Sequence, residues 1–151
     1  MRLDALSPIT NHLMPKLAEH LAHAKRLKNT LQFLCEKHDN HSEWIAVTAF
    51  YRALHLSESL LVKGNIPHDR SHVGREQALK RTKSTSHIWI HYRPLWEASN
   101  ISRYLAYQGT EYSSFATYLD PDKVVSELVN YRLREIEKSV ANQLSMDPND
   151  L

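Results

Sequence analysis

The 151 residues are 42% hydrophobic and 24% charged, which is the composition of an ordinary soluble protein and the length of one domain. The chain has only 3 glycines and 6 prolines, and this scarcity of turn residues disfavours a sheet protein. A net charge of +2 is too small to indicate nucleic-acid binding by itself. The single cysteine, Cys35, excludes an internal disulfide, and no apolar run reaches the length of a membrane span. We therefore expect a cytoplasmic protein without membrane contact.

The first predicted helix follows a short lead-in, with Thr10 or Asn11 as its N-cap and Pro15 in its first turn. Apolar residues then recur at spacings of three and four from Leu13 to Leu34. This spacing is typical of an amphipathic helix, which we expect to end near residues 38–39.

The stretch 44–63 predicts a second helix, which we expect at the centre of the fold. Asn40 and Glu43 form a capping box at its start, and Gly64 with Asn65 ends it. Apolar residues fill about two thirds of its circumference, so neighbours must cover it on three sides. The remaining arc carries its polar residues, which are Thr48, Tyr51, Arg52, His55, Glu58 and Ser59.

This polar arc supports two interpretations. Arg52, His55 and Glu58 on one narrow face can form a functional site, provided that they share a recess open to water beside the following connector. A polar strip can equally be the part of a helix that meets solvent, or a hydrogen-bonded network within the core.

Positive charge is concentrated between residues 63 and 93. This segment holds seven lysines and arginines against two acidic residues, a net charge of +5, and four of the ten histidines. A localised basic patch is typical of a phosphate-binding surface. The alternative is a solvated, mobile connector.

Two further helices are predicted in and after this segment. Ser71 is a candidate N-cap for a short helix at about 72–82, broken near its start by Gly74. A fourth helix of about 20 residues follows Ser86, and Pro94 either kinks it or marks its first turn. One strip of that helix carries Tyr92, Leu95, Trp96, Ser99 and Arg103.

The last part of the chain predicts a loop at 109–119 and then a final helix. Asp120 and Pro121 are a strong helix start, with the aspartate as N-cap and the proline in the first helical position. We expect one helical domain at 1–145 and a flexible tail at 146–151. The predicted fold class is all-α, an up-and-down bundle of four or five helices.

Two stretches together are similar to a known family. They are YRALHLSESLL, followed by a Gly-Asn-Ile-Pro turn and SHVGRE, and the later HYRPLWEASNISRY. From about Ala18 to Tyr107 the chain resembles the HEPN family of small helical-bundle proteins. The resemblance implies a HEPN-like bundle, a homodimer and a partner that is RNA or a nucleotide, with no cofactor. It also implies metal-independent ribonuclease activity or a toxin-type component paired with a nucleotidyltransferase.

Active HEPN proteins carry an arginine followed, after four to six residues, by a histidine, and Arg81 with His87 matches this spacing. The numbers of arginines and histidines alone produce such a spacing by chance, but the pair lies in the basic segment. Metal-free RNA cleavage needs a proton acceptor, a proton donor and a cation for the developing charge. The candidate catalytic residues are His55, His72, Arg75, Arg81 and His87, and the candidate substrate contacts are Tyr51, Arg52, Glu58, Tyr92 and Arg103.

Two other interpretations stay open. In a non-catalytic interaction or dimerisation module, the polar strips of the second and fourth helices bond to each other and lock the packing, and Glu58 pairs with an arginine instead of orienting an imidazole. In a metalloenzyme, His87 and His91 are ligands, although a third ligand is missing. His20 and His23 share a helix face at a spacing compatible with metal binding, but two histidines without a third ligand are usually surface residues.

Overall fold

A computed structural model describes residues 15–37, 39 and 41–151. The protein is mostly helical (76%), with the helices packed against one another, so the all-α prediction is confirmed. Its main elements are α1 (Leu17–Cys35), α2 (Ser42–Lys63), α3 (His72–Arg81), α4 (Ser86–Tyr104), α6 (Pro121–Val124), a π-helix (Val125–Leu133) and α7 (Arg134–Leu144). Within the described part of the chain, no helix is both long and apolar enough to cross a membrane.

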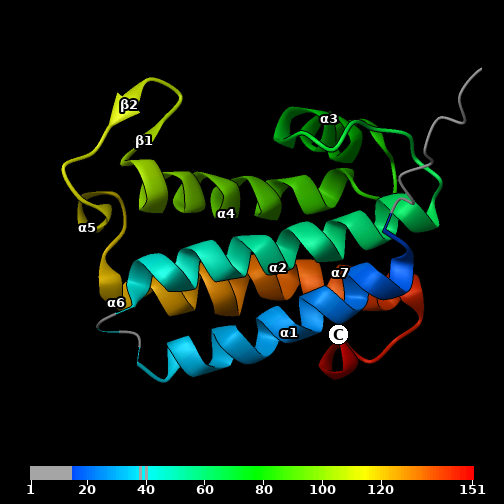
Figure 1. Ribbon diagram of the computed structural model, residues 1–151, viewed down its shortest axis with the longest axis horizontal. Helices are drawn as coiled ribbons and strands as arrows, with labels where there is room; N and C mark the ends of the chain where they lie inside the picture. The colour runs from blue at the N-terminus through cyan, green and yellow to red at the C-terminus, as the bar shows by residue number, and fades with distance from the viewer. Residues whose placement is uncertain (1–14, 38, 40) are drawn as a thin grey trace, which may run out of the picture.

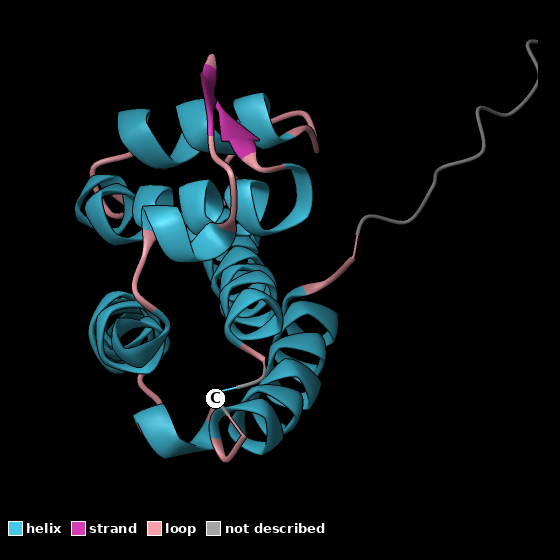
Figure 2. Ribbon diagram, turned by 90° about the vertical axis from the view of Figure 1, so that its left-hand side faces the viewer, coloured by secondary structure: helices cyan, strands magenta, loops and turns pink. Residues whose placement is uncertain are grey.

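Helix α2 is the central element, as its apolar circumference predicts. It packs against α1 on one side, α4 on the other and the π-helix and α7 behind (Figures 1 and 2). Its fully buried side chains include Ile45, Phe50, Leu56 and Leu61, which form the middle of the core. Helix α3 lies against α2 and α4 near the C-terminal end of α2.

Helix α1 begins later than the sequence predicts, whereas α2 begins at Ser42, just before the predicted stretch 44–63. Helix α1 starts at Leu17, where the Glu19 carboxylate accepts a 2.8 Å hydrogen bond from the Lys16 backbone N–H. It ends at Cys35, before residues 38–39. The expected caps Thr10 and Asn11 lie outside the described residues, as does Asn40. Helix α2 has His41 at its N-cap, with no side-chain cap bond.

The connector and α3 follow the predicted start signal. Ser71 Oγ accepts a 2.9 Å bond from the Gly74 N–H, which confirms Ser71 as the N-cap. The prediction that Gly74 breaks the helix is wrong, because Gly74 lies within it. A Cβ there would stand 2.8 Å from the Asp69 carbonyl oxygen, so the glycine allows the preceding connector to pass close to the helix. Pro94 lies inside the continuous helix α4 and does not begin it.

The predicted loop at 109–119 contains regular structure. Strands β1 (Ala106–Tyr107) and β2 (Thr110–Glu111) pair antiparallel, joined by Gln108 and Gly109, which both have positive φ. Two positive-φ residues form the tight turn whose twist matches a hairpin. One turn of helix, α5 (Phe115–Tyr118), follows.

The C-terminal part has one confirmed prediction and one correction. Asp120 accepts a 3.0 Å bond from the Asp122 N–H and Pro121 opens the helix, as predicted. Residues 146–151 are packed on the bundle, in contrast to the expected flexible tail. Pro148–Asp150 form a 3₁₀ turn, Leu151 is buried, and its backbone oxygen accepts a 3.2 Å bond from the buried Arg52.

Candidate functional site

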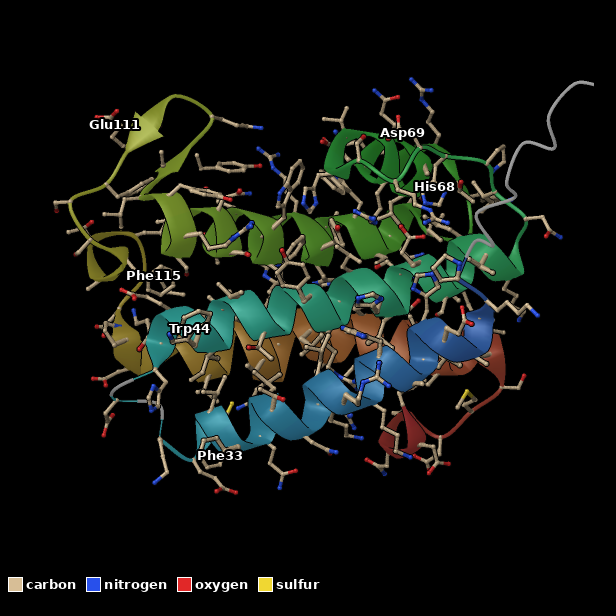
Figure 3. The ribbon with its side chains drawn as sticks, viewed as in Figure 1. Phe33, Trp44, His68, Asp69, Glu111 and Phe115 are labelled. Atoms are coloured by element: carbon tan, nitrogen blue, oxygen red, sulfur yellow. The ribbon has the colours of Figure 1, made fainter. Side chains whose placement is uncertain are left out.

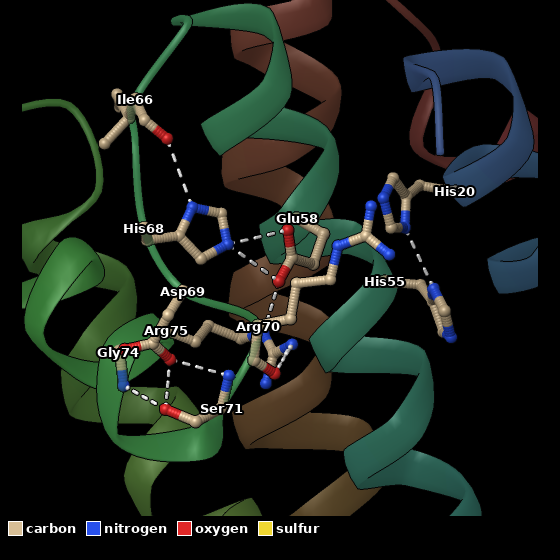
Figure 4. Close-up of polar contacts among 10 residues, drawn as sticks. All are labelled: His20, His55, Glu58, Ile66, His68, Asp69, Arg70, Ser71, Gly74 and Arg75. Atoms are coloured by element: carbon tan, nitrogen blue, oxygen red, sulfur yellow. Dashed lines mark hydrogen bonds and ion pairs between the residues drawn. The ribbon is translucent and has the colours of Figure 1, made fainter. Parts of the chain in front are cut away.

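A pocket of about 450 Å³ lies between the start of α1, the C-terminal half of α2, the 64–71 connector and α3. Its polar and charged lining residues are Lys16, His20, His55, Glu58, Asn65, His68, Arg70 and Arg75. The connector turns back over α2 because the helix ends at Gly64 and Pro67 cannot extend it. Figure 3 shows His68 above this end of α2, and Figure 4 shows the polar contacts.

Glu58 is the centre of a buried polar network. Arg75 Nε donates a 2.5 Å bond to one of its oxygens, and His68 Nε2 lies 3.1 Å from both oxygens. His68 Nδ1 also lies 3.1 Å from the Ile66 carbonyl oxygen. Burial raises the pKa of Glu58, but Arg75 and His68 outweigh it and hold the pKa below its usual value. Glu58 therefore stays ionised, and it both pairs with an arginine and orients an imidazole.

A second contact in the pocket joins two histidines from different helices. His20 Nδ1 on α1 lies 3.0 Å from His55 Nδ1 on α2, so one ring must donate and the other accept. Burial lowers the pKa of both rings, that of His55 to about 4, with the neighbouring His23 and His20 adding to the shift in His55. Both imidazoles are therefore neutral at pH 7.

The pocket is positively charged overall. With the histidines counted as neutral, Lys16, Arg70 and Arg75 against Glu58 give its lining a net charge of +2. Guanidinium groups favour phosphate and carboxylate oxygens, and neutral imidazoles can accept or donate protons near neutral pH. This combination suits an anionic ligand whose reaction needs proton transfer.

Of the candidates from the polar arc of α2, His55 and Glu58 reach this pocket and Arg52 does not. The Arg52 side chain is 0% exposed. Its Nε donates to Glu137 (2.8 Å) and its Nη1 donates to the Ala24 carbonyl oxygen (2.6 Å). Arg52 is thus part of a network within the core, which removes it from the candidate substrate contacts.

The candidates on the fourth helix lie apart from the pocket. Tyr92 is fully buried against Phe50, so it cannot touch a substrate. The Arg103 guanidinium lies 5.9 Å from the centre of the Tyr51 ring. Among the described side chains, the expected hydrogen bonds between the polar strips of α2 and α4 do not form. Arg103 instead contacts the face of the Tyr51 ring and donates to the Ser99 carbonyl oxygen within its own helix.

The remaining candidates are also separated. His72 stacks on Trp96, with 5.7 Å between the centres of the two rings, and does not line the pocket. Arg81 is exposed at the last residue of α3. His87 lies against α7, with Nε2 2.5 Å from Ser139 Oγ. Its spacing to Arg81 therefore does not bring it to the Glu58 network.

His87 and His91 line a pocket of about 320 Å³ with Glu135. In the part of the chain that the structure describes, no three His, Cys, Asp or Glu side chains are arranged to hold a metal ion.

Sequence reasoning missed His20, His68 and Arg70 as members of the site. We expect His20 to be a surface residue because no third metal ligand accompanies it and His23, yet it is buried where α1 packs against α2. His68 and Arg70 lie in the connector, where no helical periodicity indicates which way a side chain points. The high density of basic residues and histidines in 63–93 is the one sequence signal that points to His68 and Arg70.

Comparison of the chain with models of known protein families, with curated proteins and with solved structures finds no match.

Proposed function

We propose that this pocket binds the phosphate of RNA or a nucleotide, and that the protein is a HEPN-like, metal-independent ribonuclease. The observation that carries the proposal is the neutral pair His20–His55 lining the same pocket as Arg70 and Arg75. The homodimer and the nucleotidyltransferase partner implied by the resemblance belong to the same proposal, and size-exclusion chromatography with light scattering tests the dimer.

The histidine pair offers both proton-transfer functions at once. The ring that donates its Nδ1 proton has an unprotonated Nε2, and the ring that accepts has an Nε2–H. The first Nε2 takes the proton of the 2′-hydroxyl as its oxygen attacks phosphorus. The second Nε2–H protonates the leaving 5′-oxygen as the P–O bond breaks. The Nδ1 proton passes from the first ring to the second in the same step, so that no imidazolate forms and both rings end neutral, with their roles exchanged.

The other groups of the pocket would support this reaction electrostatically. Arg70 and Arg75 would stabilise the negative charge that develops on the phosphorane oxygens. Glu58 would act as a positioning residue, since it holds Arg75 and His68. A pKa of about 4 makes free His55 a weak base, but an entering phosphate places negative charge beside the ring and raises its pKa.

The test is cleavage of single-stranded RNA in the presence of EDTA. We expect His55→Asn and His20→Asn to slow cleavage by about 10²–10⁴-fold, the usual contribution of general acid–base groups. His87→Asn, which changes the histidine of the Arg81–His87 spacing, should cleave as fast as the unsubstituted protein. The proposal is rejected if the unsubstituted protein neither cleaves RNA nor retains it in a salt-sensitive manner.

A second candidate is a non-catalytic helical interaction module. The observation that favours it is that Glu58, Arg75 and His68 satisfy one another, as a structural clamp between the connector and α2 would. In that case Glu58→Gln lowers the melting temperature, and His55→Asn changes no reaction with RNA. Ribonuclease function predicts that His55→Asn slows cleavage by about 10²–10⁴-fold at little cost in melting temperature.

A further inference from the structure

A single stripe of α2 runs from the pocket to the other end of the helix. Trp44, Val47, Tyr51, His55 and Glu58 follow one another at spacings of three or four, within an arc of about 80° at 100° per residue. Figure 3 shows Trp44 at the N-terminal end of this helix and His68, in the connector, above its C-terminal end.

At the Trp44 end, a groove of about 290 Å³ lies between α2 and α4. Glu43, Trp44 and Val47 line one side, and Ser102 and Arg103 line the other. The Trp44 side chain is large and apolar, yet it is 63% exposed. An indole left open to water beside a groove is available for stacking against a planar ligand.

Arg103 brings a positive charge to this groove. Its guanidinium lies 5.0 Å from the centre of the Tyr104 ring, which is itself 67% exposed, and also faces the Tyr51 ring. Its hydrogen bonds go to neutral partners, the Ser99 carbonyl oxygen, the Tyr104 hydroxyl and the Asn100 side chain. Among the residues that the structure describes, Arg103 forms no ion pair with a carboxylate.

We infer that Trp44, Tyr51, Arg103 and Tyr104 form a stacking platform for the bases of single-stranded RNA whose phosphodiester lies in the 450 Å³ pocket. Proteins that bind single strands combine aromatic rings, on which bases stack, with cations that follow the phosphates. The inference rests on the proposed function and adds its substrate class, an unpaired strand that extends beyond the cleaved bond.

The spacing of the two regions fits such a strand. Trp44 and His55 are eleven residues apart in one helix, which is about 16 Å at 1.5 Å per residue. A stacked strand rises about 3.4 Å per nucleotide, so about five nucleotides cover this distance. Glu43 at the rim can accept a hydrogen bond from a ribose 2′-hydroxyl, a group that DNA lacks.

The test compares a long and a short ligand. Fluorescence anisotropy would measure binding of a labelled single-stranded RNA of about eight nucleotides, long enough to reach both regions, and of a dinucleotide that fills the pocket alone. We expect Trp44→Ala and Arg103→Ala to weaken binding of the longer RNA at least about fivefold, the low end for one base stack, and to leave dinucleotide binding unchanged. Trp44→Phe, which keeps an aromatic face, should restore most of the affinity.

Phe33→Ala is the matched control, because Phe33 is an aromatic residue 56% exposed on α1. It should bind both ligands like the unsubstituted protein. If the longer RNA binds and Trp44→Ala and Arg103→Ala do not weaken it, the platform is rejected while the pocket proposal stands. If the substitutions change only the oligomeric state, the groove is a contact between copies of the chain. If the unsubstituted protein binds neither ligand, both proposals fail.

Discussion

The guanidinium of Arg52 donates a 2.8 Å hydrogen bond to the carboxylate of Glu137, 85 residues away, with the arginine side chain entirely buried. The same guanidinium donates to the Ala24 carbonyl oxygen, so one side chain joins α1, α2 and α7. Burial lowers the pKa of Arg52, and the neighbouring Glu137 opposes this shift. The pair therefore belongs to the architecture that holds the pocket in shape, and the pocket itself lies elsewhere on α2.

Replacing Arg52 with methionine should destabilise the protein by about 3–5 kcal/mol, because it leaves the Glu137 carboxylate without its buried partner. Urea unfolding followed by circular dichroism measures the change. The control is Lys138→Ala, which removes an exposed pair with Glu135 and should cost under about 1 kcal/mol. Equal losses in the two variants would contradict a buried role for Arg52.

The double variant Arg52→Met, Glu137→Met separates the loss of a partner from the loss of the pair. Exchanging both members of a buried ion pair for apolar residues is often close to neutral. We therefore expect the double variant to be more stable than Arg52→Met alone. A double variant less stable than Arg52→Met would show that the other contact of this carboxylate, a 3.3 Å hydrogen bond from Arg134, outweighs the cost of burying it without Arg52.

Gly74→Ala should destabilise the protein, although alanine favours a helix by about 1 kcal/mol over glycine. The added Cβ would lie 2.8 Å from the Asp69 carbonyl oxygen, and backbone cannot move away cheaply. We expect a loss of about 1–3 kcal/mol in the free energy of unfolding, as for other overpacked sites.

Gly64→Ala is the matched control for Gly74→Ala. Its Cβ would first meet the end of the Ile66 side chain at 3.0 Å, which can rotate. It should be clearly better tolerated than Gly74→Ala in the same unfolding measurement. A stabilising Gly74→Ala would mean that the connector does not pass this close to α3.

Acid should weaken the fold through His55. Its pKa is lowered from 6.5 to about 4 by burial, by His23 and His20 on α1 and by Arg75 on α3, against the opposing charge of Glu58. Between about pH 6.5 and pH 4, His55 is protonated in the unfolded chain but stays neutral in the folded protein. The free energy of unfolding therefore falls as the pH drops through this range.

His55→Asn should remove part of this acid sensitivity. The measurement is the difference in unfolding free energy between pH 7.5 and pH 5, which we expect to be smaller in the variant, by on the order of 1 kcal/mol once the partial exposure of the ring is allowed for. An unchanged difference would show that the ring is not held neutral.

Local sequence signals, such as helix caps and apolar periodicity, predicted the helices well wherever such signals are present. Asp120 with Pro121, Ser71 and the apolar circumference of α2 act within one or two turns, and the structure follows all three. The Gln108-Gly109 hairpin was missed because its strands have only two residues each and show no alternation.

The candidate site was predictable only in part, because its geometry depends on long-range packing. His55, Glu58 and Arg52 share one polar arc in the sequence, but that arc meets the pocket on one side and α7 on the other. The Arg52–Glu137 contact joins residues 85 positions apart, and the His20–His55 contact joins residues 35 positions apart. No local sequence pattern predicts contacts over such separations.

The most direct test of the pocket as an RNA site is a titration of the protein with single-stranded RNA, followed by long-range ¹H–¹⁵N correlation spectra of the histidine rings. The proposed function predicts that the ring signals of His20, His55 and His68 shift, and that those of His87 and His91, on the α7 side, do not. Shifts confined to His87 and His91, with the three pocket rings unchanged at saturating RNA, would contradict it.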